Sequence, residues 1–180
     1  MTAKEILEKA ASYIGITEDP KGSNNVPFVK DYFGYIPSNA AEYAPWCVIF
    51  VWDVFRLAGA SELFFDGKKV GSCTRVWNWA KANGLVVTVP RPGDLVLLDW
   101  NGDKTADHIG FVEQVHETTL TTIEGNCDDA VKRTTRNKSL ALVYIRPKYT
   151  APEIPGNCAA CSLRTMLLEL YNTLKEESTK

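Results

Sequence analysis

The chain has 180 residues, of which 45% are hydrophobic, and its 20 Lys and Arg against 22 Asp and Glu give a formal net charge of −2. This length allows one domain with a packed core and a small appendage, and it excludes a second large domain. The near-neutral charge, without a basic cluster, offers no electrostatic basis for binding nucleic acid or an anionic membrane. We therefore expect neither as a partner.

The first residues predict a helix over 3–14. Thr2 and Glu5 form a capping-box pattern, and apolar residues follow at helical spacing, namely Ile6, Leu7, Ala10 and Ile14. The segment lacks the basic start and the continuous apolar run of a signal peptide, so we expect synthesis in the cytoplasm without a signal peptide. No span approaches the roughly 20 apolar residues that a membrane helix needs.

Three more helices are predicted over 27–33, 45–58 and 74–82. In the second of these, Pro45 suits the first turn, and Cys47 therefore lies in that turn. Three influences would favour the reactive thiolate at Cys47: the positive end of the helix, a nearby imidazole and partial exposure.

Strands are predicted near 94–99, 108–116, 119–125 and 140–146. On the second strand His108 shares a face with Gly110, while Ile109 and Phe111 point to the other face. A turn near Glu117 would fold the next strand back antiparallel, which brings residues 124 to 126 beside His108.

Helices that come first and strands that come later favour an α+β fold, with the N-terminal helices packed on an antiparallel β-sheet. Residues 1–149 form the predicted catalytic domain, 150–157 a linker rich in Pro and Gly, and 158–180 a C-terminal amphipathic helix. Four leucines mark one face of that helix: Leu163, Leu167, Leu170 and Leu174. This face either docks on its own domain or associates with a second chain.

Cysteine, histidine and a carboxylate in this order indicate a cysteine hydrolase. A thiolate attacks an acyl carbon, an imidazole takes the thiol proton and later gives it to the leaving amine, and a third polar group orients the ring. Backbone N–H groups at the start of the Cys47 helix would hold the developing oxyanion. Glu124 and Asn126 are both candidates for the third group, because either can accept the imidazole N–H.

The sequence resembles the CHAP domain, the cysteine, histidine-dependent amidohydrolase/peptidase family of papain-like hydrolases. The resemblance rests on four stretches: Tyr43 to Trp52 around Pro45-Trp46-Cys47, Pro92 to Val96, Asp107 to Glu113, and Ile123 to Asn126. It implies a papain-like fold with Cys47 as nucleophile, His108 as base, and Glu124 or Asn126 as the third member. Trp46, beside the cysteine, is the expected substrate-binding residue. The chain departs from the family at Val48, where a small residue is more usual.

The resemblance also implies a function. The substrate would be bacterial peptidoglycan, with an amide or peptide bond cleaved as in phage endolysins, and no cofactor is required. The enzyme would reach the wall after lysis or through a pore. Two alternatives stay open: a toxin-type amidase or peptidase acting on a soluble peptide, and a catalytically idle wall-binding module.

The other cysteines and the second histidine have simpler interpretations. Cys73 and Cys127 are expected to be small buried hydrophobic residues, and Cys127 follows Asn126 closely enough to approach the site. Cys158 and Cys161 form a lone C-x-x-C, which without further ligands is weak support for zinc. His116 lies about 26 Å along the strand from His108, at roughly 3.3 Å per residue, so it is expected to be a solvated surface residue.

The loop from Asp99 to Asp107 resembles the first half of a calcium loop. Its oxygen-bearing side chains alternate, and the candidate ligands are Asp99, Asn101, Asp103 and Asp107. The glycine and glutamate that an EF-hand needs further along are replaced by Lys104 and Gly110. The alternative to calcium is a turn in which these side chains accept hydrogen bonds from the local backbone.

Overall fold

The structure is a computed structural model that describes residues 1–34 and 45–151. Met1–Thr150 form one compact unit. The described residues do not include the predicted helix over 158–180, which carries the leucine face and the two cysteines of the C-x-x-C. They also do not include the predicted linker from residue 152 onward. Within the described part of the chain, no helix combines the length and the apolar character needed to cross a membrane.

All four helices predicted for the catalytic domain are present. They are α1 (Ala3–Ala11), α2 (Pro27–Phe33), α3 (Cys47–Leu57) and α4 (Cys73–Ala82), with short 3-10 turns at η2 (Ser61–Leu63), η3 (Phe65–Gly67) and η4 (Lys138–Leu140). The predicted capping box at the start of α1 is confirmed, since Thr2 accepts from the Glu5 N–H and Glu5 from the Thr2 N–H. Helix α3 begins at Cys47 with Trp46 as its N-cap, so Pro45 precedes the helix instead of lying in its first turn.

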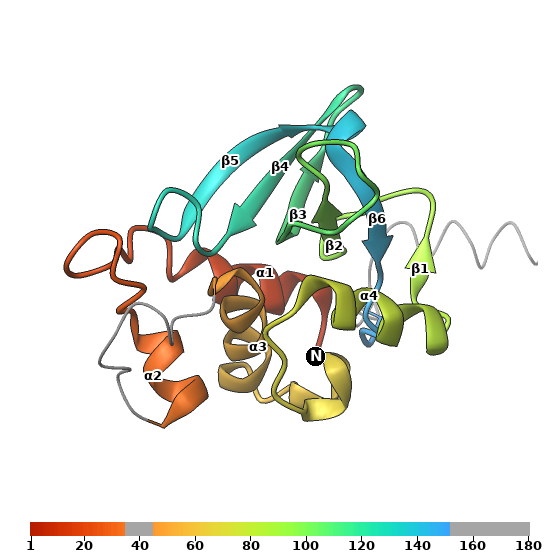
Figure 1. Ribbon diagram of the computed structural model, residues 1–180. Helices are drawn as coiled ribbons and strands as arrows, with labels where there is room; N and C mark the ends of the chain where they lie inside the picture. The colour runs from red at the N-terminus through yellow and green to blue at the C-terminus, as the bar shows by residue number, and fades with distance from the viewer. Residues whose placement is uncertain (35–44, 152–180) are drawn as a thin grey trace, which may run out of the picture. The chain divides into compact units, whose positions relative to one another are not determined.

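The described strands form one six-stranded antiparallel sheet in the order β1-β6-β2-β3-β4-β5 (Figure 1). Their bounds are β1 (Val86–Val87), β2 (Leu95–Leu98), β3 (His108–Val115), β4 (Thr119–Glu124), β5 (Lys132–Asn137) and β6 (Ala141–Ile145). The α+β prediction is confirmed. Strands β1 and β5 were not predicted, and β5, of sequence KRTTRN, has no apolar residue to reveal it.

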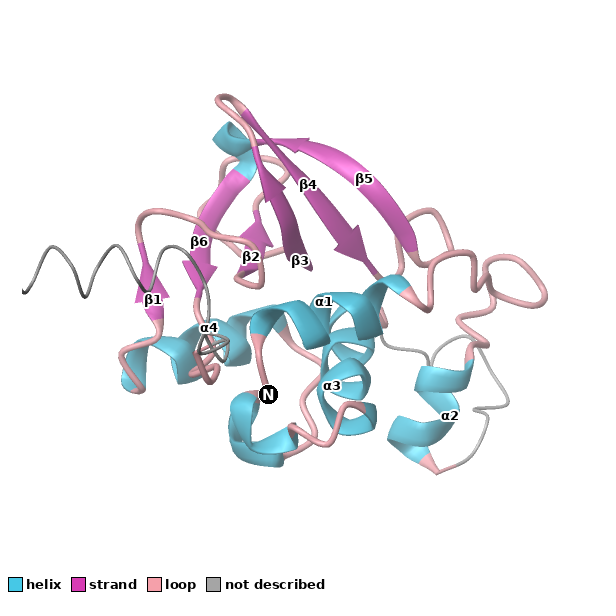
Figure 2. Ribbon diagram, turned by 180° about the vertical axis from the view of Figure 1, so that it is seen from behind, coloured by secondary structure: helices cyan, strands magenta, loops and turns pink. Residues whose placement is uncertain are grey.

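Helices and sheet form two layers, with α1, α3 and α4 on one side of the sheet (Figure 2). Helix α3 is buried from Cys47 to Phe55, and its aromatic rings pack on the sheet. Phe50 and Phe55 lie with their ring centroids 6.1 and 5.9 Å from that of Phe111 on β3. The opposite face of the sheet has its own small apolar cluster of Val96, Leu98, Val112 and Leu120. His108 and Gly110 therefore lie on the face away from Ile109 and Phe111, as predicted.

An N-terminal segment ties two distant parts of the sequence together. Thr17 pairs with Ala130, and the Glu18 N–H donates to the Asp129 carbonyl at 2.9 Å, so this segment lies against the loop that follows β4. The buried Glu18 carboxylate also accepts from Trp46 Nε1 at 2.7 Å. The start of α3 and the loop after β4 are thus held by the same few residues.

The Pro92-Gly93-Asp94 turn has a structural role. Asp94 is buried, accepts from the Arg91 N–H at 2.7 Å, and forms a two-bond ion pair with Arg146 at 2.8 and 2.7 Å. The Val112 N–H donates to the Asp94 carbonyl at 2.8 Å, which fixes the start of β2 against β3. This motif therefore sets the position of the strand that carries His108.

Candidate active site

Cys47 is the first residue of α3. Its N-cap, Trp46, provides no side-chain hydrogen bond, so the positive end of the helix dipole is left without a side-chain cap at the thiol. The residue is only 3% exposed. The predicted partial exposure is therefore wrong, because α3 packs into the core along both its first turn and its middle.

The Cys47 thiol lies beside a second thiol, that of Cys73. Cys73 begins α4, a helix capped by the Ser72 side chain, which accepts from the Arg75 N–H. A hydrogen bond from Cys73 is the main cause that holds the pKa of Cys47 well below its usual value. Burial acts in the opposite direction and raises this pKa. The hydrogen bond and the charge of His108, and a hydrogen bond from the Val48 backbone, lower it further. The hydrogen bond between the two thiols, together with burial, raises the pKa of Cys73. Cys47 is thus the thiol that ionises, and Cys73 keeps its proton.

His108 opens β3 and faces both the thiol and a carboxylate. Its Nε2 lies 3.0 Å from Glu124 Oε2, so the other ring nitrogen is left for Cys47. Burial lowers the pKa of His108, but hydrogen bonds to Cys47 and Glu124 and the charges of both outweigh it and raise the pKa to about 9. Cys47 and His108 therefore favour a thiolate–imidazolium pair at neutral pH.

Glu124 ends β4 and is fully buried. It accepts from Thr122 Oγ1 at 2.5 Å, and from Arg136 Nε and Nη2 at 2.9 and 2.6 Å. Burial raises the pKa of Glu124, but the hydrogen bonds from His108 and Arg136 lower it to about 2, so the group is ionised. A Cβ at Gly110 would lie 2.6 Å from Glu124 Cγ, so the glycine on β3 provides the room that this side chain occupies.

Glu124, and not Asn126, makes the contact with His108. Asn126 lies two residues on, in a left-handed backbone conformation with φ of 56°. The structure thus orients the imidazole through the carboxylate, whereas the sequence left both residues open. The part that either residue plays in turnover stays a prediction.

Trp46, the predicted substrate-binding residue, lies in the core, and substrate binding by it stays a prediction. Trp46 is fully buried, and its ring stacks on that of Phe28 with centroids 5.7 Å apart. Its indole N–H donates a hydrogen bond to the Glu18 carboxylate. Its position next to Cys47 in the sequence suggested contact with substrate, but as the N-cap of α3 it points into the core. It anchors the helix that carries the thiol.

Three neighbours of the site were missed from the sequence: Cys73, Arg136 and Trp100. Arg136 comes from β5, the strand without an apolar pattern, and its guanidinium lies 4.9 Å from the Trp100 ring. Trp100 is 44% exposed, and its ring centroid lies 5.7 Å from that of His108. Trp100 is therefore an exposed aromatic side chain beside the imidazole.

The remaining candidates lie where the sequence predicted them. Cys127 is buried and approaches the site, since its sulfur accepts from Arg136 Nη2 at 3.3 Å. His116 is exposed and pairs with Thr121 Oγ1 at 3.0 Å, away from the thiol.

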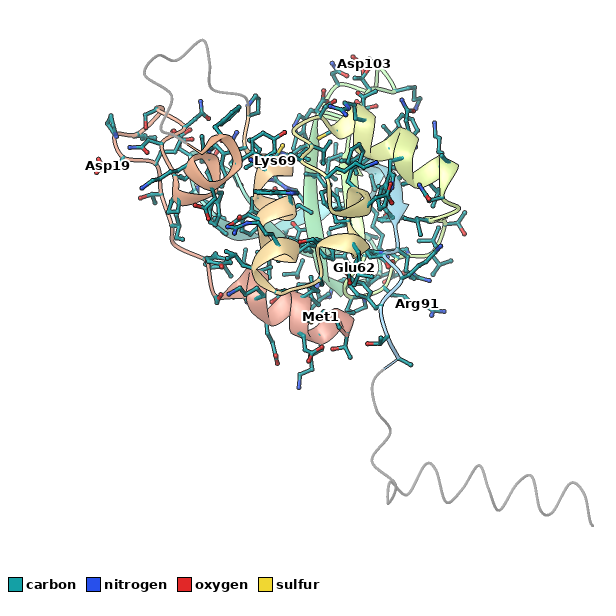
Figure 3. All side chains as sticks on the ribbon, turned by 90° about the horizontal axis from the view of Figure 1, so that it is seen from below. Met1, Asp19, Glu62, Lys69, Arg91 and Asp103 are labelled. Carbon is teal, nitrogen blue, oxygen red and sulfur yellow. The ribbon has the colours of Figure 1, made fainter. Side chains whose placement is uncertain are left out.

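The loop from Asp99 to Asp107 uses its carboxylates on its own backbone. Asp99 accepts from the N–H groups of Gly102 and Lys104 at 2.7 and 2.9 Å, and Asp107 accepts from the Trp100 N–H at 2.8 Å. Asp103, at the rim of the domain in Figure 3, accepts from the Thr105 N–H at 2.7 Å and from the Asn101 amide at 3.2 Å. Within residues 1–34 and 45–151, no group of three or more acidic, His or Cys side chains is arranged to hold a metal. This arrangement is that of the hydrogen-bonded turn, and calcium binding by the loop stays a prediction.

A buried thiol at a helix start, an imidazole and an oriented carboxylate are the side chains with which cysteine hydrolases work. Residues 38–126 match the CHAP domain family, and the chain carries a CHAP domain. No curated protein matches the sequence.

Several solved structures resemble this one, among them two of Ly7917. The crystal structure of Ly7917 has 19% sequence identity, a TM-score of 0.49, and a match over 82% of this chain and 63% of that chain. The crystal structure of Ly7917 with the hydrolyzing product of MDP has 17% identity, a TM-score of 0.48, and a match over 81% and 63%. The match thus spans less than two thirds of either structure.

Proposed function

We propose that this protein is a peptidoglycan hydrolase that cleaves an amide or peptide bond of the bacterial cell wall through a thiol mechanism. The observation that carries the proposal is the set of Cys47, His108 and Glu124 within a CHAP domain: His108 Nε2 lies 3.0 Å from Glu124 Oε2, and the His108 imidazole helps to lower the pKa of Cys47. CHAP domains occur in phage endolysins and in bacterial wall-remodelling enzymes, which supports the wall as substrate and a role as an endolysin.

In the proposed reaction, the Cys47 thiolate attacks the carbonyl carbon of the scissile amide. The N–H groups at the start of α3 stabilise the oxyanion, and the His108 imidazolium gives its proton to the leaving amine. His108 then removes a proton from water, the water oxygen attacks the thioester carbon, and the C–S bond breaks, which releases the carboxylic acid product and restores the thiolate–imidazolium pair. Glu124 holds the ring in the orientation that both proton transfers need.

Access to the thiol is the condition that this proposal must meet, because Cys47 is almost completely buried. Alkylation with iodoacetamide measures access without a substrate. We expect Cys47 to be modified in the native protein faster than Cys127, which has a raised pKa owing to burial. A native protein that iodoacetamide does not modify at Cys47 would contradict the thiol mechanism.

Clearing of a suspension of purified cell walls tests the activity itself. We expect wild type to clear the walls, Cys47→Ala to be inactive, and His116→Ala, at the exposed histidine away from the thiol, to stay active. Equal clearing by wild type and Cys47→Ala would refute the proposal. Mass spectrometry of the released fragments would name the bond, either the one joining muramic acid to L-alanine or one within the stem or cross-bridge peptides.

The same assay separates the two alternatives. A toxin-type amidase would leave walls intact and cleave a soluble peptide, with the same dependence on Cys47. A wall-binding module would sediment with the walls and release nothing.

A further inference from the structure

Arg136 forms a two-bond ion pair with the carboxylate that orients His108, and it comes from the strand at the edge of the sheet. We propose that Arg136 is a positioning residue of this site, which fixes the plane of the Glu124 carboxylate so that one oxygen is presented to His108 Nε2. The inference rests on the proposed function for its consequence in turnover, but the arrangement itself can be tested without a substrate.

The hydrogen bonds of Glu124 show how the carboxylate is fixed. Oε1 accepts from Thr122 and Arg136 Nε, while Oε2 accepts from Arg136 Nη2 and faces His108. A guanidinium presents two parallel N–H groups, so both oxygens are held in one plane. Oε2 is then directed at the imidazole.

Burial makes this ion pair necessary. Glu124 is fully buried, and a buried carboxylate without a permanent positive partner takes up a proton. The titratable and charged groups that face it are His108 from β3, Arg136 from β5 and the Cys127 thiol after β4. Of these only Arg136 keeps its charge at every pH at which the imidazole titrates.

The register of the sheet shows that this contact is not a simple cross-strand pair. Lys132 is the residue directly opposite Glu124, and Arg136 is opposite Leu120. Lys132 instead pairs with the exposed Asp128 at 2.8 Å. Arg136 therefore reaches along the sheet to a carboxylate that already has a nearer basic neighbour.

Trp100 also restrains the guanidinium of Arg136. Its ring lies 4.9 Å from the Arg136 guanidinium and 5.7 Å from the His108 ring, so it contacts both groups that hold Glu124. Arg136 also donates to Cys127 at 3.3 Å. These contacts leave the guanidinium little freedom to leave the carboxylate.

The test compares Arg136→Met, Arg136→Lys and the control Arg133→Met. Arg133 lies on the same strand and forms an equivalent two-bond pair with Glu113 at 2.6 and 2.8 Å, but it is half-exposed and away from the site. The first measurement is the NMR titration of the imidazoles. The chain has only two histidines, so His116 serves as an internal reference.

In Arg136→Met we expect the pKa of His108 to fall by at least about one unit, because Glu124 then takes up a proton and no longer stabilises the imidazolium. His116 should not move, and Arg133→Met should titrate like wild type. A folded Arg136→Met protein with an unchanged or raised His108 pKa would overturn the proposal, whether or not the protein hydrolyses cell walls.

Arg136→Lys separates the positive charge of Arg136 from the planar geometry of its guanidinium. If Arg136→Met does not fold, Arg136→Lys alone tests whether Arg136 positions Glu124. A lysine keeps the positive charge but lacks the two parallel N–H groups of the guanidinium. Because the charge is kept, we expect the His108 pKa to stay near that of wild type. The rate of Cys47 alkylation and, on walls, kcat should nevertheless fall at least about fivefold with KM unchanged. If Arg136→Lys showed the wild-type rates of Cys47 alkylation and of wall hydrolysis, the planar guanidinium would have no positioning role.

Discussion

Gly110→Ala should displace the carboxylate of Glu124 without adding backbone strain. The new Cβ would lie 2.6 Å from Glu124 Cγ and 3.3 Å from the Ile123 carbonyl oxygen, whereas ordinary contacts are 3.4 Å or more. Glu124 cannot simply swing away, because Thr122, Arg136 and His108 hold both of its oxygens. Either one of these hydrogen bonds breaks or β3 and β4 move apart.

Overpacking of this kind costs about 1 to 3 kcal/mol, which for a chain of this size lowers Tm by roughly 2 to 12 °C. We expect kcat/KM for wall hydrolysis to fall by at least about tenfold, since the imidazole loses its orienting partner. Gly71→Ala is the matched control, because its Cβ would meet only the Tyr32 hydroxyl at 3.7 Å and Ile49 Cγ1 at 3.9 Å. Wild-type Tm and activity in Gly110→Ala would show that the close approach between β3 and Glu124 has no influence on the site.

Three further predictions concern the groups around the thiol. Because the pKa of Glu124 is lowered from 4.5 to about 2, its contribution to stability is present above pH 4.5 and is lost as the pH falls towards 2. The free energy of unfolding, measured with urea, should therefore fall by about 3 kcal/mol over this pH range. In Glu124→Gln the side chain cannot titrate, so the free energy of unfolding should fall less over the same range. Cys73→Ala removes the hydrogen bond to Cys47, so the pH profile of iodoacetamide alkylation should shift to higher pH. Cys73→Ser keeps a donor and should shift less, and identical profiles in wild type and Cys73→Ala would contradict the assigned cause. Trp46→Phe keeps the aromatic ring but leaves a buried Glu18 oxygen without its partner, which should cost about 1 to 3 kcal/mol in the same unfolding assay, and an unchanged midpoint would refute that role.

The sequence predicted the parts of the site that depend on local pattern. The alternation along β3 placed His108 on the same face as Gly110, and the hairpin turn then brought Glu124 beside it, because antiparallel pairing follows directly from strand spacing. The helical spacing after Trp46 likewise placed Cys47 at the start of α3.

Contacts between elements distant in the sequence could not be predicted in the same way. Cys73 meets Cys47 because the first residues of α4 and α3 come together in space, and no spacing rule fixes that arrangement. Arg136 lies on a polar edge strand whose sequence resembles a loop, and its partner is four residues away from the position that the register would suggest. The burial of Cys47 also depends on the whole core, so a polar, reactive role wrongly suggested an open position.

The segment around Thr17 and Glu18 links the start of α3 to the loop after β4, although none of the proposed reacting groups lies in it. A fragment beginning at Lys21 would retain the Cys47 sulfur, the His108 imidazole and the Glu124 carboxylate, yet it would lose the anchor shared by α3 and the chain beyond β4. Trimming this domain to the span that carries these three groups would therefore remove contacts that hold the start of α3 and the loop after β4, although none of the three groups would be lost.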